Sequence, residues 1–198
     1  MTSAVTTLLT TFGVIFIAEL PDKTALAALV LGTRYRTLSV IAGGWLAFLV
    51  QTAIAVTAGG LLTALPARPV RVAAGFGFLA FAVMAWRRRE EEVQRDEDAA
   101  AGEAVRRGRP GWLSAFLVIF AAEWGDLTQL ATAALVAQTH EPLAVGLGAL
   151  AALWLVTVIA AVAGSQLQRF LTASMLARIS AAVFATVGIL VILSGVRG

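Results

Sequence analysis

Long apolar runs, separated by short polar connections, fill almost the whole chain. They predict six helical spans, roughly over residues 4–31, 38–62, 70–87, 112–137, 142–165 and 174–196. A helix needs about 20 mainly apolar residues to cross the hydrocarbon core of a bilayer. The pattern therefore predicts an all-α integral membrane protein of about six transmembrane helices, in contact with the lipid bilayer.

The composition supports this picture and excludes several classes of protein. Of the 198 residues, 59% are hydrophobic and 14% are charged, whereas a soluble domain is about half apolar and about one quarter charged. The net charge is only +3 and the arginines stand mostly at the ends of apolar runs, so we expect no nucleic-acid partner. The chain has no cysteine and a single histidine, His140. Thiolate and histidine-rich metal sites are therefore excluded, and we expect no resident cofactor.

One strongly polar segment, from Arg87 to Gly111, divides the chain near its middle. Its dense charges of both signs cannot lie in hydrocarbon, so we expect an aqueous loop. We accordingly predict a first three-helix unit over residues 1–87, a charged loop over 88–111 and a second three-helix unit over 112–198.

The two units share a short motif. The run Glu19-Leu20-Pro21-Asp22-Lys23-Thr24 aligns, 104 positions later, with Glu123-Trp124-Gly125-Asp126-Leu127-Thr128. Weaker matches in the second spans pair Gly43 with Gly148 and Gly59 with Gly164. A repeat with an odd number of spans makes the second copy enter the membrane from the opposite side. The sequence therefore predicts two inverted three-helix repeats, an architecture that recurs in secondary transporters.

The arginines predict the orientation. If the connections after spans one, three and five share one side, that side holds Arg34, Arg36, Arg87, Arg88, Arg89, Arg95, Arg106, Arg107, Arg109, Arg169 and Arg178, against Arg68, Arg71 and Arg197 on the other. Positive charge marks cytoplasmic loops. We therefore predict a multi-pass protein of the cell membrane, with a cytoplasmic central loop and both termini outside the cytoplasm.

Away from the ends of the spans, the clearly charged residues all belong to the two motifs: Glu19, Asp22, Lys23, Glu123 and Asp126. A carboxylate in mid-membrane is costly unless it is paired, protonated or bound to a cation. On a helix, two acids three residues apart share one face, and inverting one repeat would bring the two faces together. We expect four carboxylates to converge, with further oxygens from Thr24, Thr128, Gln129 and Gln51. Such an all-oxygen pocket suits hard divalent cations.

The helix breakers Pro21 and Gly125 stand at equivalent places inside the motifs. Proline removes a backbone donor and glycine loosens a turn. Broken helices with exposed carbonyls are typical of cation sites at mid-membrane. A structural alternative remains for the first motif, because Glu19 and Lys23 are four residues apart and could form an ion pair.

The paired motifs resemble the duplicated signature Glu-x-Gly-Asp-Lys/Arg-Thr/Ser of a family of small Ca²⁺/Mn²⁺:H⁺ exchangers. That family includes Golgi and chloroplast cation exchangers and bacterial manganese exporters. The resemblance spans essentially the whole chain and implies transport of Mn²⁺ or Ca²⁺ against protons. It implies Glu19, Asp22, Glu123 and Asp126 as the ion-binding set, with Thr24 and Thr128 beside them. In two places the chain departs from the signature, since Pro21 replaces a glycine and Leu127 replaces a basic residue.

Other functions stay open at this stage. The chain could export another small substrate such as an amino acid, or serve as a non-transporting membrane scaffold, and it could form a homo-oligomer. A membrane enzyme is disfavoured, because the chain has no His-Glu-x-x-His or Gly-x-Ser-x-Gly motif and no histidine in a span to act as a base. A divalent cation/proton exchanger is the leading interpretation.

Overall fold

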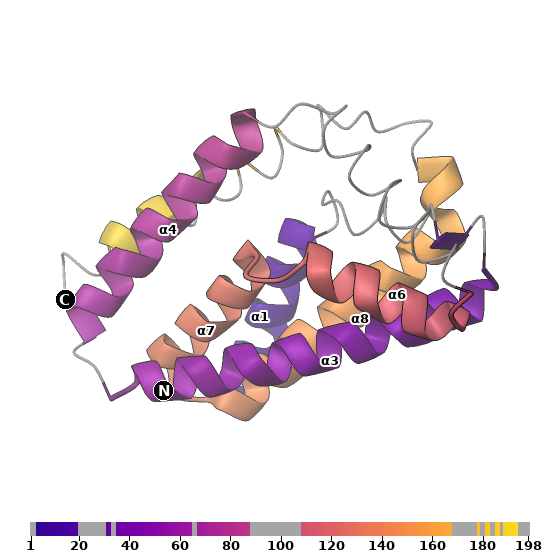
Figure 1. The fold of residues 1–198 in the computed structure, drawn as a ribbon. Helices are drawn as coiled ribbons and strands as arrows, with labels where there is room; N and C mark the ends of the chain where they lie inside the picture. The colour runs from indigo at the N-terminus through magenta and orange to yellow at the C-terminus, as the bar shows by residue number, and fades with distance from the viewer. Residues whose placement is uncertain are drawn as a thin grey trace.

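The elements that the computed structural model describes are all helices. It describes residues 3–19, 31–32, 35–64, 67–87, 108–167, 178, 181–182, 185–186 and 188–193. In the labels of Figure 1, these include α1 (Ala4–Glu19), α3 (Thr37–Leu62), α4 (Ala67–Arg87), α6 (Gly111–Ala122), α7 (Leu127–Thr139) and α8 (Pro142–Leu167). The predicted second, third and fifth spans agree with α3, α4 and α8 to within three residues at each end.

Two of the described helices are long and apolar enough to cross a membrane. They are Thr37–Leu62 and the Pro142–Val162 part of α8, and α1 and α6 are shorter apolar helices. At a rise of about 1.5 Å per residue, the 26 residues of α3 extend about 39 Å, more than the roughly 30 Å of a hydrocarbon core. Length and composition of these two helices therefore fit membrane spans.

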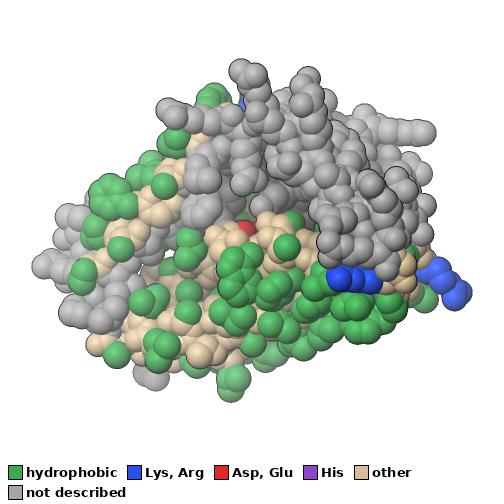
Figure 2. All heavy atoms as spheres, in the orientation of Figure 1, with side chains coloured by type: hydrophobic (Ala, Val, Ile, Leu, Met, Phe, Trp, Pro, Cys, Tyr) green, Lys and Arg blue, Asp and Glu red, His purple; other side chains and the backbone are tan. Residues whose placement is uncertain are grey.

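Large apolar side chains point outward from most of the described helices. Leu38 and Leu143, for example, are 78% and 81% exposed. Figure 2 shows apolar side chains over much of the described face, with a group of arginine side chains at one end. Soluble proteins rarely expose such a continuous apolar surface, so this outer face fits contact with lipid.

The predicted fourth span, residues 112–137, is not one helix. It consists of α6 and α7, separated by a turn at residues 123–126 in which Gly125 has a φ of 69°. The expectation that Glu123 and Asp126 share one helix face is therefore wrong, because both lie in the break. In the first half, α1 ends at Glu19, and residues 20–30 lie outside the described part of the chain.

The first helix of each half packs against the second helix of the other half. At Gly148 in α8, a Cβ atom would lie 2.5 Å from the Leu8 carbonyl oxygen of α1. At Gly43 in α3, it would meet the equivalent oxygen, that of Trp112 in α6. Only glycine allows backbones to approach so closely. Equivalent glycines thus make equivalent contacts, at residues that the repeat matches.

The two long helices α3 and α8 run antiparallel. Gly44 lies next to Thr157, while Val56, a little over three turns further along α3, lies next to Gly146 near the start of α8. Between these points Trp45 and Trp154 stack with their ring centroids 4.7 Å apart. Each indole N–H donates to the backbone oxygen of the other tryptophan, at 3.2 and 3.1 Å. Helices at matching places in the two halves therefore point in opposite directions.

The starts of α3 and α6 lie together at one end of the molecule. The Tyr35 hydroxyl is 3.1 Å from the Ser114 hydroxyl, and the Tyr35 ring packs against Gly111. Arg36 directly precedes α3, and Arg109 stands two residues before the start of α6. The residues that lead into α3 and those that lead into α6 therefore lie side by side.

Candidate cation site

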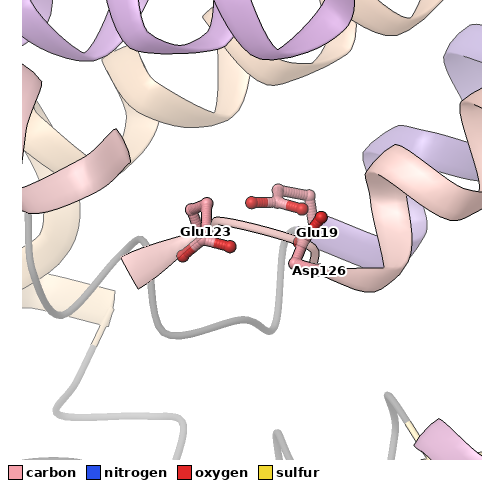
Figure 3. A group of neighbouring side chains, drawn as sticks. All are labelled: Glu19, Glu123 and Asp126. Carbon is pink, nitrogen blue, oxygen red and sulfur yellow. The ribbon is translucent and has the colours of Figure 1, made fainter. Parts of the chain in front are cut away.

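Three buried carboxylates from the two halves converge on one point. Glu19 ends α1, Glu123 follows α6, and Asp126 precedes α7. One carboxylate oxygen from each lies within 4.8 Å of the others, and the three side chains are 0%, 1% and 9% exposed. Figure 3 shows the three carboxylates pointing toward one another. The predicted convergence is confirmed for these three acids.

The break between α6 and α7 follows from the local sequence. Asp126 is the N-cap of α7, and its carboxylate accepts a hydrogen bond from the Gln129 backbone N–H at 3.1 Å. The Thr128 hydroxyl donates to the same carboxylate at 3.0 and 3.2 Å. An Asp-x-x-Gln sequence is a typical start of a helix, and Gly125 supplies the left-handed residue that directs the chain into it. Asp126 is thus positioned by ordinary capping interactions.

Gln129 braces the turn from inside. Its amide nitrogen donates to the Glu123 carbonyl at 2.8 Å, and its amide oxygen accepts from the Gly125 N–H at 3.3 Å. Both ends of the amide are therefore engaged with backbone. In the structure, this side chain therefore ties together the turn that carries Glu123 and Asp126.

Gln51 approaches the same region from α3. It is 1% exposed, and its amide nitrogen donates to the Phe120 carbonyl in the last turn of α6 at 3.0 Å. The sequence predicts Gln51 only as a possible oxygen ligand and does not predict this role as a hydrogen-bond donor. An isolated glutamine at the middle of a long apolar helix is the signal that could have identified it, because a buried amide needs a partner.

The chemistry of this cluster requires a positive partner. Two ionised carboxylates no more than 4.8 Å apart repel by at least about 3.5 kcal/mol at an effective dielectric constant of about 20. Three such groups in a buried site are not stable together unless cations or protons neutralise part of the charge. The oxygen donors fit a hard divalent cation, which prefers carboxylate oxygens.

Part of the predicted site lies outside the described residues. This holds for Pro21, Asp22, Lys23 and Thr24, and for the side chain of Leu127. Of the remaining predicted residues, Thr128 is buried beside Asp126. His140 lies in the connection before α8, as expected, where it ends α7 in a left-handed conformation.

Comparison with known proteins identifies relatives over both halves. The model of a family described as "Divalent cation/proton antiporter GDT1" matches residues 7–93 and 111–198. A GDT1-like protein of the cyanobacterium Synechocystis is 35% identical over 64% of the chain and 68% of its own length. Two Arabidopsis thaliana proteins, the chloroplastic PAM71-homolog and GDT1-like protein 3, are 28% and 29% identical over 87% and 91% of the chain. The chain spans only 55% and 66% of these two plant relatives. No solved structure matches the chain.

Proposed function

This chain belongs to the GDT1 family of divalent cation/proton antiporters, and on that premise we propose that it exchanges Mn²⁺ or Ca²⁺ for protons across the cell membrane. The observation that carries the proposal is the meeting of Glu19 with Glu123 and Asp126 in a buried cluster. Acids from both halves would hold one ion between them. Family membership supports a location in the membrane, and the carboxylate cluster supports a divalent cation as the transported substrate.

Exchange follows from competition for the same oxygens. A divalent cation bound by the cluster neutralises the mutual repulsion of the carboxylates, and protons do the same when the cation leaves. Because neither state leaves the buried charges uncompensated, the site can alternate between cation and protons. Interacting carboxylates titrate as a set, so the proton count belongs to the cluster and not to one residue.

We assign distinct roles to the residues of the site. Glu19, Glu123 and Asp126 bind the ion, with Asp22 as the fourth acid by its match to Asp126. Thr128 orients the Asp126 carboxylate, and Thr24 takes the equivalent role in the first motif. Gly125 lies in the break between α6 and α7. By their places in the first motif, we assign Pro21 the role of helix breaker and Lys23 that of offsetting part of the negative charge.

We further propose six spans in two inverted three-helix repeats, with the central loop in the cytoplasm. The antiparallel course of α3 and α8 supports inversion, as do the matched contacts of Gly43 and Gly148. The separate family match to each half supports duplication. Inverted repeats allow alternating access, because one half can rock against the other around a shared site.

Export of a larger substrate such as an amino acid is the second candidate. It fits the cluster less well. Carboxylates within 4.8 Å of one another leave room for an ion, and nothing in their arrangement calls for an organic substrate. A scaffold without transport leaves the cost of three buried acids unexplained.

Transport by the purified protein in liposomes tests the proposal. Vesicles would carry a fluorescent Mn²⁺ or Ca²⁺ indicator in one preparation and a pH indicator in another. Entry of the cation together with a matching exit of protons is expected. Cation entry without proton movement would remove the exchange, and entry of neither ion under an imposed proton gradient would refute the transport function.

A further inference from the structure

One buried polar residue of α3 has no polar equivalent in the other half. Residues of α3 and α8 correspond at an interval of 105 positions, and buried residues match buried residues. Such pairs are Val40 and Val145, Ala47 and Ala152, Phe48 and Leu153, Thr52 and Thr157, and Ala55 and Ala160. Within this matched series Gln51, 1% exposed, stands opposite Val156, 2% exposed. Burying an amide where the other half buries an alkyl group calls for a specific reason.

The hydrogen bond of Gln51 gives that reason. Helix ends leave their last carbonyls without partners in the helix. At the end of α6, the Ile119 carbonyl accepts from the Glu123 N–H and the Ala121 carbonyl from the Trp124 N–H. The Phe120 carbonyl between them accepts from the Gln51 amide. A side chain of α3 thus completes the cap of the segment that carries Glu123.

Glu123 is therefore held from two directions. Gln51 fixes the backbone three residues before it, and Gln129 fixes the carbonyl of Glu123 itself. In the first half, the residue that corresponds to Phe120 is Phe16, and the residue that corresponds to Gln51 is Val156. Valine cannot donate a hydrogen bond, so the backbone before Glu19 lacks this particular tie.

We propose that Gln51 is a positioning residue of the cation site, which sets the affinity for the divalent ion by holding the Phe120 carbonyl and, through it, Glu123. The inference rests on the proposed function and adds to it a residue outside the duplicated motifs. Gln51 acts through the backbone of α6. Through that contact it holds the backbone that leads into Glu123.

Two substitutions at this position separate the hydrogen bond from simple space filling. Gln51→Val installs the residue that the matched position of α8 already accommodates, so the protein is expected to fold. Gln51→His keeps a ring N–H that can donate to the Phe120 carbonyl. Gln138→Val is the matched control, because Gln138 lies on α7 twelve residues beyond Asp126, roughly 18 Å along the helix axis.

The measurements are KM and Vmax for Mn²⁺ uptake into liposomes, and the melting temperature in detergent with and without Mn²⁺. For Gln51→Val we expect a KM about threefold to tenfold higher, the factor expected from losing one hydrogen bond between membrane helices. Vmax should stay within about twofold, and the stabilisation by Mn²⁺ should shrink, because ion affinity sets that stabilisation. Gln51→His should fall between wild type and Gln51→Val, and Gln138→Val should match wild type.

Each other outcome has a definite meaning. An unchanged KM in Gln51→Val, or equal defects in the valine and histidine variants, overturns the positioning role. A lower melting temperature with an unchanged KM reduces Gln51 to a packing residue and also overturns it. If the wild-type protein itself moves no divalent cation, the proposed function fails. If the wild-type protein transports the ion and the Gln51→Val variant behaves identically, only the positioning role of Gln51 fails.

Discussion

Replacing one glutamate of the cluster by glutamine should abolish transport while the protein still folds. Glu123→Gln and Glu19→Gln keep the shape of the side chain and remove one negative charge. Both residues are almost fully buried, so solvent cannot compensate for the missing charge. The effect can be worked out from the geometry of the three carboxylates.

The lost attraction exceeds the repulsion that is relieved. A divalent ion about 2.4 Å from a carboxylate oxygen gains about 14 kcal/mol from it at an effective dielectric constant of about 20. Removing that charge also relieves two repulsions of about 3.5 kcal/mol each at the outer separation of 4.8 Å. The net loss is about 7 kcal/mol. Even if the amide oxygen recovers half of it as a neutral ligand, the affinity falls by more than about a hundredfold.

Uptake of Mn²⁺ and Ca²⁺ into liposomes measures this effect, with the melting temperature as a check on folding. Glu141→Gln is the matched control, because Glu141 is a carboxylate in the connection before α8 and outside the cluster. It should transport like wild type. Wild-type rates in both Glu19→Gln and Glu123→Gln would refute the shared site, because neither acid could then be holding the ion.

Three further predictions concern topology, exchange and packing. Cysteines introduced at Thr2 and Gln94 should react with an impermeant reagent from opposite sides of intact cells, and labelling of position 94 from outside would reverse the orientation. Lower pH on the side where Mn²⁺ loads should raise its KM without changing Vmax, by up to about tenfold per pH unit for each proton displaced, and a pH-independent KM would argue against competition. Gly43→Ala should lower the melting temperature, because its Cβ would collide with the Trp112 carbonyl at a cost of about 1–3 kcal/mol. Gly60→Ala, with no atom of the described residues within 4 Å of the new carbon, should not, and equal stability of the two would contradict the close contact.

The sequence predicted the spans well wherever hydrophobicity alone decides them. α3 and α8 are apolar over most of their length and begin just after the charged residues Arg36 and Glu141, so their predicted ends lie close to the observed ones. The fourth span was harder, because its apolar residues continue across the break. The capping sequence from Asp126 to Gln129 marks the start of a new helix. The apolar residues on both sides of it nevertheless favour the interpretation of one continuous helix.

The candidate site was predictable in its members but not in its supports. Buried acids in an apolar chain are conspicuous, and duplication indicated that they meet. Nothing in the spacing showed that α1 packs on α8 and α6 on α3. The donor role of Gln51 also depends on this arrangement, since Phe120 lies 69 positions away in the chain. Contacts between distant segments are set by packing, which residue spacing does not record.

The exchange of helices between the halves explains why the site depends on both. α1 carries Glu19 but packs against α8 of the second half, while α6, which leads into Glu123, packs against α3 of the first. Each glutamate is therefore attached to a helix that packs against the other half. When one half moves relative to the other, neither glutamate can simply follow its own repeat. The movement changes the separation between the carboxylates, and the energy of a bound divalent ion changes with that separation. On the proposed function, ion binding would therefore be coupled to the relative position of the two halves through a few short oxygen distances.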